Sequence, residues 1–416
     1  MTILQVDANS AYLSWTAAAL LEQGYPVDIR RIPAVIAGDP NNRHGIILAK
    51  SIPAKKRGVK TGCSLMEAKE ACPELLIFPP DYDLFLACSD AMQDILSEYT
   101  PRIQRYSIDE SFLDYRRSAL HPLSPVDAAF EIRDRIRREL GFTVNVGVAP
   151  NKVLAKMACE LEKPDRVHTV LTESEMREKI WPLPVSELFM VGRSTTRRLK
   201  RININTIGDL AQADPGMLQA LLKSHGKLIW NYANGIDHDP VTTSDALLRK
   251  SVGNGMTMPG DVYTAEEADL YLLSLCERVG MRLRRHGLKS SLIAVGICSS
   301  GFFYYTHQLQ LPFYTDDTTT IYRLAARLFR ECWKHEPLRK LSVRAGGLID
   351  RKGYQLSIFD IDSLKKSEAL NRAVDRIRGR FGPRAIERGC FANTPYDPIE
   401  GGVNDGNYLM MGGYRQ

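Results

Sequence analysis

Several features are missing from this 416-residue sequence, and each absence excludes a class of protein. The closest two of its eight cysteines, Cys63 and Cys72, stand nine residues apart, so it has no C-x₂-C pair of a zinc site. No apolar run reaches the roughly 18–20 residues that span a bilayer, so we expect no membrane association. The first residues lack a basic segment followed by an apolar core. We therefore expect no signal peptide and a cytoplasmic protein with reduced thiols.

The composition is that of a globular protein with real cores, at 44% hydrophobic and 25% charged residues. At roughly 100–200 residues per domain, the length predicts about two to four domains. The formal net charge of +6 permits a nucleic-acid partner but does not require one. Basic side chains gather at residues 193–201 (RSTTRRLKR), which hold five basic and no acidic residues. A solvated helix face remains the alternative for this run.

The order of strand and helix patterns divides the chain into regions. Short apolar runs such as ILQV (3–6) alternate with helical patterns such as 83–100 through the first 165 residues, which indicates an α/β or α+β domain. Residues 166–240 carry short helical patterns broken by glycines. From 249 onward the order is β-α-β-β-α-β, a unit of about 100 residues. Residues 391–416 are rich in Gly and Asn, and we expect their end to be poorly ordered.

Two acidic positions are candidates for chemistry. Asp7 ends the first strand pattern, and Asp109 with Glu110 lies between two strand-like runs in YSIDESFLD (106–114). Each acid taken alone is often only solvated at a sheet edge, and neighbouring residues of an ideal strand point to opposite sides. Three carboxylates that converge where the chain bends would form a hard oxygen site for Mg²⁺. Such a site suits phosphoryl or nucleotidyl transfer.

Six segments between residues 6 and 241 resemble motifs of the Y-family DNA polymerases and occur in the family's order, within a resemblance that covers about 350 residues. The tetrapeptide SIDE (107–110) is the most specific of them in this company. The segments are VDANSAYLSW (6–15), RGVKTGCSLMEAKEACP (57–73), YSIDESFLD (106–114), VGVAPNKVLAKMACELEKP (146–164), INTIGDLA (204–211) and ANGIDHDPV (233–241). The later helix pattern SEALNRAVDRIRGRFG (367–382) is similar to bacterial members related to the catalytic subunit of the SOS mutagenesis polymerase.

The resemblance implies an α+β right-hand polymerase with palm, fingers, helical thumb and β-α-β-β-α-β little finger. The expected boundaries are palm 1–9 and 80–165, fingers 10–79, thumb 166–240, linker 241–249, little finger 250–350 and C-terminal extension 351–416. The thumb is expected to contain a helix-hairpin-helix-like turn. We expect the protein to be a monomer.

The resemblance also implies a metal site. Asp7, Asp109 and Glu110 match the catalytic carboxylates, and the backbone carbonyl of Ala8 would be a further ligand of two Mg²⁺ ions. The family's usual second aspartate, two residues after Asp7, is Asn9 here. That position is commonly not a direct ligand, so we expect activity to survive the change.

Three residues match nucleotide contacts of the family. Tyr12 falls on the aromatic steric gate that excludes a ribose 2′-OH. A core aromatic residue on a helix would produce the same sequence pattern and is the alternative. Lys156 matches a lysine that reaches the triphosphate. Lys55 stands where the family usually has an arginine, so it keeps the charge and loses the bidentate fork. Ala11 and Ile52 replace aromatic residues near these contacts, which leaves nucleotide affinity open.

The resemblance implies contacts to DNA and to a sliding clamp. In the thumb, a turn at Gly192 could bind a DNA phosphate through backbone N–H groups, with Arg193, Arg197 and Arg198 adding charge, although Met190 replaces the turn's first glycine. QLSIF resembles the clamp-docking peptide of bacterial polymerases, with one polar anchor and apolar plugs. Its residues are Gln355, Leu356, Ser357, Ile358 and Phe359. An ordinary strand end remains the alternative for this peptide.

The sequence thus predicts a template-directed DNA polymerase. It would add dNTPs to a primer 3′-OH on primer-template DNA, in low-fidelity translesion synthesis during DNA repair and the SOS response. One alternative is a non-catalytic DNA- and clamp-binding member of the same fold. Another is a nucleotidyl cyclase-like palm enzyme, which would share the paired acids but has no need of a thumb, little finger or clamp peptide.

Overall fold

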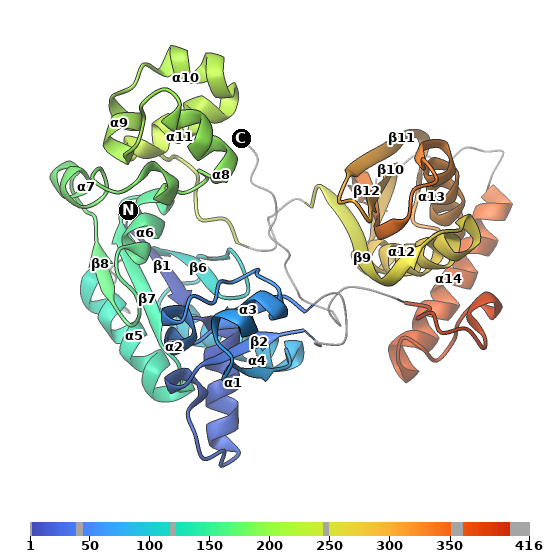
Figure 1. The fold of residues 1–416 in the computed structure, drawn as a ribbon, viewed down its shortest axis with the longest axis horizontal. Coiled ribbons are helices and arrows are strands. Elements are labelled where there is room, and N and C mark those ends of the chain that lie inside the picture. The colour runs from blue at the N-terminus through green and yellow to red at the C-terminus, as the bar shows by residue number, and fades with distance from the viewer. Residues whose placement is uncertain (1, 39–44, 117–121, 244–248, 351–360, 400–416) are drawn as a thin grey trace. The chain divides into compact units, whose positions relative to one another are not determined.

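The computed structural model describes residues 2–38, 45–116, 122–243, 249–350 and 361–399, without the side chains of 361–365. The chain divides into two units (Figure 1). The first is built from the elements β1 to α11, and the second from β9 to the C-terminal helices.

The first unit is centred on a five-stranded sheet in the order β5-β6-β1-β7-β8. Its strands are β1 (Thr2–Ala8), β5 (Ile103–Arg105), β6 (Glu110–Tyr115), β7 (Val144–Ala149) and β8 (Val167–Thr169). The middle strand, β1, pairs antiparallel with both β6 and β7. Leu4 and Val6 face one core and Ile3 faces the other, so the nearly continuous apolar run of this strand reflects burial on both faces.

Helices cover both faces of this sheet. The helices α1 (Ala11–Glu22), α4 (Tyr82–Ser97) and α5 (Pro125–Leu140) contribute to the core that contains Leu4, and α6 (Lys152–Glu160) contributes to the other. The close contact of α6 with β7 requires a glycine. A Cβ atom at Gly147 would lie 2.0 Å from the Ala155 carbonyl oxygen, which no side chain could tolerate.

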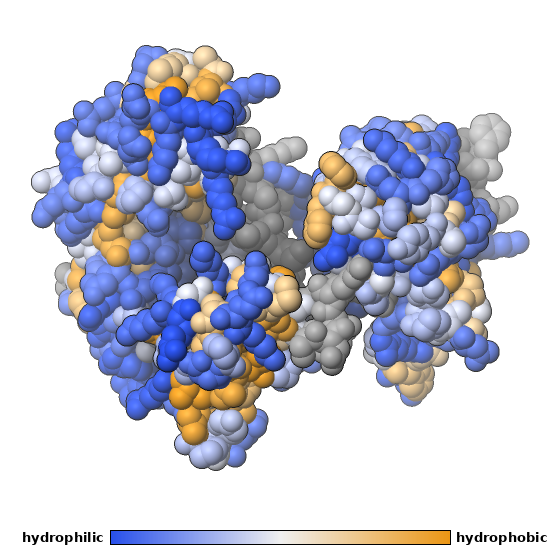
Figure 2. All heavy atoms as spheres, viewed as in Figure 1, coloured by the Kyte–Doolittle hydropathy of each residue, from blue (hydrophilic) through white to orange (hydrophobic). Residues whose placement is uncertain are grey.

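A smaller, three-stranded sheet in the order β3-β2-β4 belongs to the same unit. It consists of β2 (Ala34–Ala37), β3 (Ile47–Lys50) and β4 (Leu76–Phe78), with η1 (Ile29–Arg31), α2 (Ile52–Lys56) and α3 (Leu65–Ala71) around it. The capping box expected at the start of α3 is present, because Ser64 and Glu67 each bond the other's backbone N–H. Figure 2 shows hydrophobic side chains gathered around α1 on an otherwise mainly hydrophilic face of this unit.

Short helices complete the first unit. They are α7 (Glu173–Lys179), η2 (Val185–Glu187), α8 (Arg193–Lys200), α9 (Ile207–Gln212), α10 (Pro215–Leu222) and α11 (Ser224–Ala233). The glycine-punctuated region therefore folds as a helical subdomain, whose core it shares with α6.

The second unit has the predicted β-α-β-β-α-β order. Its elements are β9 (Ser251–Val262), α12 (Ala265–Arg285), β10 (Leu288–Ser299), β11 (Tyr304–Thr315), α13 (Thr318–Cys332) and β12 (Leu338–Asp350). The four strands form an antiparallel sheet in the order β11-β10-β12-β9. Side chains of α12 and α13 share one core with alternate strand residues such as Ile293, Val295 and Val343, so both helices lie on the same face.

A C-terminal extension packs on this unit through buried charges. It contains α14 (Ile361–Phe381) and η5 (Gly389–Phe391). The carboxylate of Glu277 on α12, only 5% exposed, accepts from Arg378 at 2.7 Å and from Arg388 at 2.6 Å. Phe391 and Ile399 are buried, so the tail beyond residue 390 begins as an ordered segment. The QLSIF peptide at 355–359 lies outside the described residues.

Replacing Glu277 by Ala should therefore destabilise the second unit. The change leaves the guanidinium of Arg378 buried without its carboxylate, which typically costs about 3–5 kcal/mol. Glu331→Ala is the matched control, because Glu331 pairs with Arg327 on the exposed side of α13 and such pairs contribute about 0–1 kcal/mol. Urea unfolding followed by circular dichroism measures the stability of both variants. Equal losses of stability would show that the buried ion pairs of Glu277 contribute no more than the exposed pair of Glu331.

Candidate active site

Two acids meet where β1 and β6 lie side by side. Asp7 stands directly opposite Glu110 in the antiparallel register, which places both side chains on the same face of the sheet. Glu160, in the last turn of α6, brings a third carboxylate to the same place. Oxygen atoms of these three side chains lie within 4.8 Å of one another. The arrangement offers a set of hard oxygen ligands to a divalent cation.

Asp109, the third acid predicted from the sequence, lies beside this group. It precedes β6, its carboxylate accepts a 2.5 Å hydrogen bond from the Ser107 hydroxyl, and its carbonyl accepts from the Ala8 N–H at 2.9 Å. Within the described residues the acidic group consists of Asp7, Glu110 and Glu160, without Asp109. The structure thus brings together two of the three predicted acids and adds Glu160. A metal-ligand role for Asp109 and for the Ala8 carbonyl stays a prediction.

Two lysines neutralise these carboxylates. The Nζ atom of Lys156 lies 2.7 Å from Glu110, and that of Lys163 lies 2.9 Å from Asp7 and 3.0 Å from Glu160. Lys156 also approaches Glu160, at 3.9 Å. Cationic groups thus already occupy the positions that face the acids, which supports the view that this place favours positive charge.

The pKa values of the site reflect burial and crowding. Burial, reinforced by the negative charge of Glu110, raises the pKa of Asp7 to about 7 in spite of the attraction of Lys163. Burial alone would lower the pKa of Lys156, but the nearby carboxylates outweigh it and raise that pKa. The same balance raises the pKa of Lys163. A further cation at this place would favour the ionised form of Asp7.

Asn9 holds the segment that carries Lys163. Its side-chain amide donates to Asn145 Oδ1 at 3.1 Å, and its Oδ1 accepts from the Asp165 N–H at 2.9 Å. The buried Asn145 in turn donates to the carbonyls of Cys159 and Glu162. An asparagine fits here because both a donor and an acceptor are used, which gives a structural reason for Asn9 in this chain.

Tyr12 lies on α1 in an aromatic cluster. Its ring is partly buried and stacks on Phe85 with the centroids 4.4 Å apart, while Trp15 and Tyr82 meet it edge-on. This packing fixes the ring just after the strand that ends in Asp7 and Ala8. The geometry fits both a core aromatic and a gate residue.

Lys55 lies on α2 with an exposed side chain. Burial lowers the pKa of Lys50 at the end of β3, and the positive charge of Lys55 lowers it further. Lys50 donates to the Thr61 hydroxyl at 2.8 Å. The two lysines are therefore near enough for their positive charges to interact.

The turn before α8 agrees in part with a phosphate-binding hairpin. Met190 has φ 71°, in the left-handed region that favours glycine, so the missing glycine is replaced without loss of the turn. Gly192 is the N-cap residue of α8, and no side chain makes a capping hydrogen bond there. The side chains of Arg193, Arg197 and Arg198 are exposed. The Arg198 guanidinium donates to the Leu221 carbonyl, which leaves Arg193 and Arg197 better placed for an anion.

Sequence reasoning missed Glu160 and Lys163. Both extend the face that starts with Lys156, because Glu160 is four residues later and Lys163 three more. The spacing K-x₃-E-x₂-K was therefore a usable signal. Gln5 was also missed: its fully buried amide donates to Glu110 at 3.4 Å from the neighbouring part of β1.

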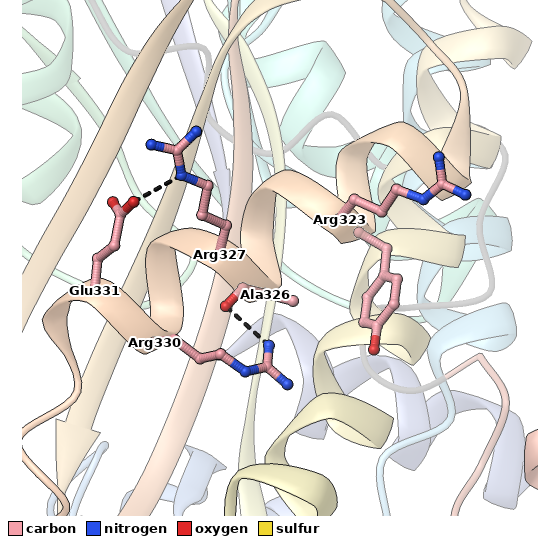
Figure 3. Close-up of a pocket in the computed structure, with 6 residues that line it drawn as sticks. Arg323, Ala326, Arg327, Arg330 and Glu331 are labelled. Carbon is pink, nitrogen blue, oxygen red and sulfur yellow. Dashed lines mark hydrogen bonds and ion pairs between the residues drawn. The ribbon is translucent and has the colours of Figure 1, made fainter.

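An open pocket of about 580 Å³ on the second unit does not resemble an active site (Figure 3). Its lining comes from α13 alone: Tyr322, Arg323, Ala326, Arg327, Arg330 and Glu331. Arg327 pairs with Glu331 at 2.7 Å and Arg330 pairs with Asp269.

Among the described residues, no helix is long and apolar enough to cross a membrane.

Three family models match the chain. Residues 6–160 match the impB/mucB/samB family, and residues 249–358 match the C-terminal domain of that family. Residues 187–237 match a model described as the thumb domain of DNA polymerase iota.

Curated relatives match over nearly the whole chain. DNA polymerase IV of Clostridium acetobutylicum is 44% identical over 93% of this chain and 97% of its own. DNA polymerase IV 2 of Bacillus subtilis is 35% identical over 93% of both chains. Among solved structures, a Y-family DNA polymerase chimera of Dbh and Dpo4 matches 84% of this chain and all of its own, with a TM-score of 0.72. At 22% identity, that likeness concerns the fold.

Asn9→Asp should weaken the fold around the site. The new carboxylate cannot donate a hydrogen bond to Asn145 and places a negative oxygen against the Oδ1 atom of Asn145. The free energy of unfolding should therefore fall by about 1–3 kcal/mol. Asn203→Asp is the control, because Asn203 is exposed and lies in a turn. Thermal unfolding compares the two, and an Asn9→Asp variant as stable as its control would show that the network contributes little.

Proposed function

The chain belongs to the Y family of DNA polymerases, the impB/mucB/samB family, and we propose that it extends a primer 3′-OH by two-metal nucleotidyl transfer. The observation that supports this mechanism is the convergence of Asp7, Glu110 and Glu160 at the ends of paired strands. A non-catalytic member of the fold would have no use for three crowded carboxylates, of which Asp7 is buried, because their like charges repel one another.

The donor set fits Mg²⁺, which prefers carboxylate and carbonyl oxygens. We propose that Asp7, Asp109, Glu110 and the Ala8 carbonyl hold two ions, which would stabilise negative charge on the attacking and leaving oxygens. Glu160 would then hold Lys163 in place, because these side chains are 3.0 Å apart.

The chain's own cations would serve the triphosphate. With Asp7 and Glu110 serving as ligands of metal ions, the ammonium groups of Lys163 and Lys156 would be available to pair with phosphate oxygens. Lys55 would add charge from α2. Tyr12 would place its ring against the sugar and exclude a 2′-OH, supported by the stack on Phe85.

The uncovered face of the second unit's sheet suits a DNA backbone. α12 and α13 pack on the other face, and the strand register arranges the uncovered side chains in cross-strand rows. The rows are Tyr304–Cys298–Lys340–Thr257, Thr306–Gly296–Ser342–Gly255, Gln308–Ala294–Arg344–Gly253 and Gln310–Leu292–Gly346–Ser251. Their charged members, Lys340 and Arg344, are both basic. With the basic N-terminal turn of α8, this face would bind primer-template DNA mainly through phosphates.

These assignments make residues 1–9 and 80–165 the palm, 10–79 the fingers, 166–240 the thumb and 250–350 the little finger. The fingers sheet has only three short strands. Such a small domain would enclose the nascent base pair loosely, which supports low-fidelity synthesis past lesions. A role of this synthesis in the SOS response is part of the proposal. We propose that the protein acts as a monomer with a sliding clamp.

Removing a metal ligand tests the mechanism. Glu110→Ala and Asp109→Ala should each lower primer extension with Mg²⁺ by about 1,000-fold or more, because the ions supply several kcal/mol of stabilisation. DNA affinity should stay within a few-fold, since phosphate contacts provide most of it. Glu162→Ala, an exposed acid near the site, should keep full activity. Near-normal extension by either ligand variant would refute the site assignment.

Tyr12→Ala tests sugar selection. Loss of the ring should raise incorporation of rCTP relative to dCTP by about tenfold or more, because the clash with the 2′-OH disappears. Tyr12→Phe keeps the ring and should discriminate like the wild type. If Tyr12→Ala extends primers with unchanged sugar preference, Tyr12 is a core residue only.

The clamp peptide is tested by replacing Gln355, Leu356 and Phe359 together with Ala. Losing two apolar side chains at ~1.5–3 kcal/mol each should weaken docking roughly a hundredfold or more. Clamp-stimulated synthesis should disappear while basal synthesis on short primers persists. Loss of basal synthesis would indicate a structural segment, and full clamp stimulation would place the docking peptide elsewhere.

A further inference from the structure

Three consecutive aromatic residues stand exposed at the turn between β10 and β11. Phe302 and Phe303 are each 71% exposed, and Tyr304, at the start of β11, is 59% exposed. Aromatic side chains of this size usually bury most of their surface in a core or an interface. Their exposure at one turn therefore indicates a surface that meets a partner.

The backbone holds these rings in place. The N–H of Ser299 donates to the Phe303 carbonyl at 3.0 Å, the N–H of Phe302 donates to the Ser299 carbonyl at 2.9 Å, and the N–H of Ser300 donates to the Pro337 carbonyl at 2.8 Å. Phe302 has φ 62°, a conformation that is unfavourable for a bulky side chain. The chain thus keeps a strained residue in order to present this turn.

Positive charge surrounds the rings. The guanidinium carbon of Arg339 lies 4.7 Å from the centroid of the Phe302 ring. Tyr304 belongs to the same cross-strand row as Lys340, on the uncovered face of the sheet. The aromatic turn is therefore continuous with the basic face that would bind DNA. Rings flanked by cationic groups are typical of surfaces that bind single-stranded nucleic acid.

Two other exposed surfaces of this unit give weaker grounds for a binding site. Leu370, Ile377 and Phe381 are exposed on α14, but nothing in the structure indicates what would cover them. The arginines of the α13 pocket in Figure 3 largely pair with acids of their own unit. Among the residues of this unit that the structure describes, only the β10–β11 turn combines exposed rings, a fixed backbone and adjacent basic side chains of a sheet face suited to DNA.

We infer that Phe302 and Phe303 form a stacking platform for an unpaired base of the template strand, with Arg339 and Lys340 contacting the phosphates beside it. The occupant is single-stranded because the faces of paired bases are covered by their neighbours in a duplex. This inference rests on the proposed function, since it takes the uncovered sheet face as the DNA side of the unit.

The full-length enzyme can test this with primer-templates whose single-stranded overhang carries 2-aminopurine at successive positions. Stacking on a ring should quench its fluorescence at one or two of these positions. The double variant Phe302→Ala/Phe303→Ala should abolish that quenching and lose about tenfold in affinity for the overhang substrate, with little change for blunt duplex. Phe302→Tyr/Phe303→Tyr should restore both. Phe381→Ala, which removes an equally large exposed ring from α14, should match the wild type.

Unchanged quenching and affinity in the Ala variant would overturn the inference. So would an equal loss on blunt duplex, which would indicate a duplex contact, or a loss of clamp stimulation alone, which would indicate a protein partner. Circular dichroism verifies that the variants are folded. Primer extension by the wild type reports on the proposed function separately, because the stacking readout requires no catalysis.

Discussion

The antiparallel pairing of β1 with β6 is the constraint on which the candidate site depends. It sets Asp7 opposite Glu110, and β7 on the other side of β1 fixes the same strand from both edges. A shift of one residue in this register would turn the acids to opposite faces and move the apolar residues of β1 out of their two cores. Core packing and site geometry are therefore determined by the same hydrogen-bond ladder.

Much of this arrangement could be predicted from local sequence. The run ILQV, the capping residues of α3 and the β-α-β-β-α-β order follow from periodicity and turn residues, and the structure confirms them. The resemblance to Y-family polymerases is also confirmed, by family models and by relatives over most of the chain. These signals are short-range, so a single sequence carries them.

Other features depend on contacts between distant segments and could not be predicted. Glu160 and Lys163 reach the acids only because Gly147 lets α6 approach β7 closely. The strand β9 runs as far as Val262 because a register irregularity opposite β12 accommodates the residues between Thr257 and Val262. Ion pairs such as Lys289–Glu368 and Glu277–Arg378 anchor the extension after residue 360 on the second unit. Hydrophobic patterns in a sequence do not reveal such pairs.

The lysines beside the acids have a consequence for assembly of the enzyme. Lys156 and Lys163 act as built-in counterions, so the three carboxylates can be packed together during folding without a divalent ion from solution. Zinc fingers behave in the opposite way, because their folding free energy comes from the metal. In this chain the sheet around the three carboxylates should therefore fold without a divalent ion, which would be needed for the reaction and not for the fold.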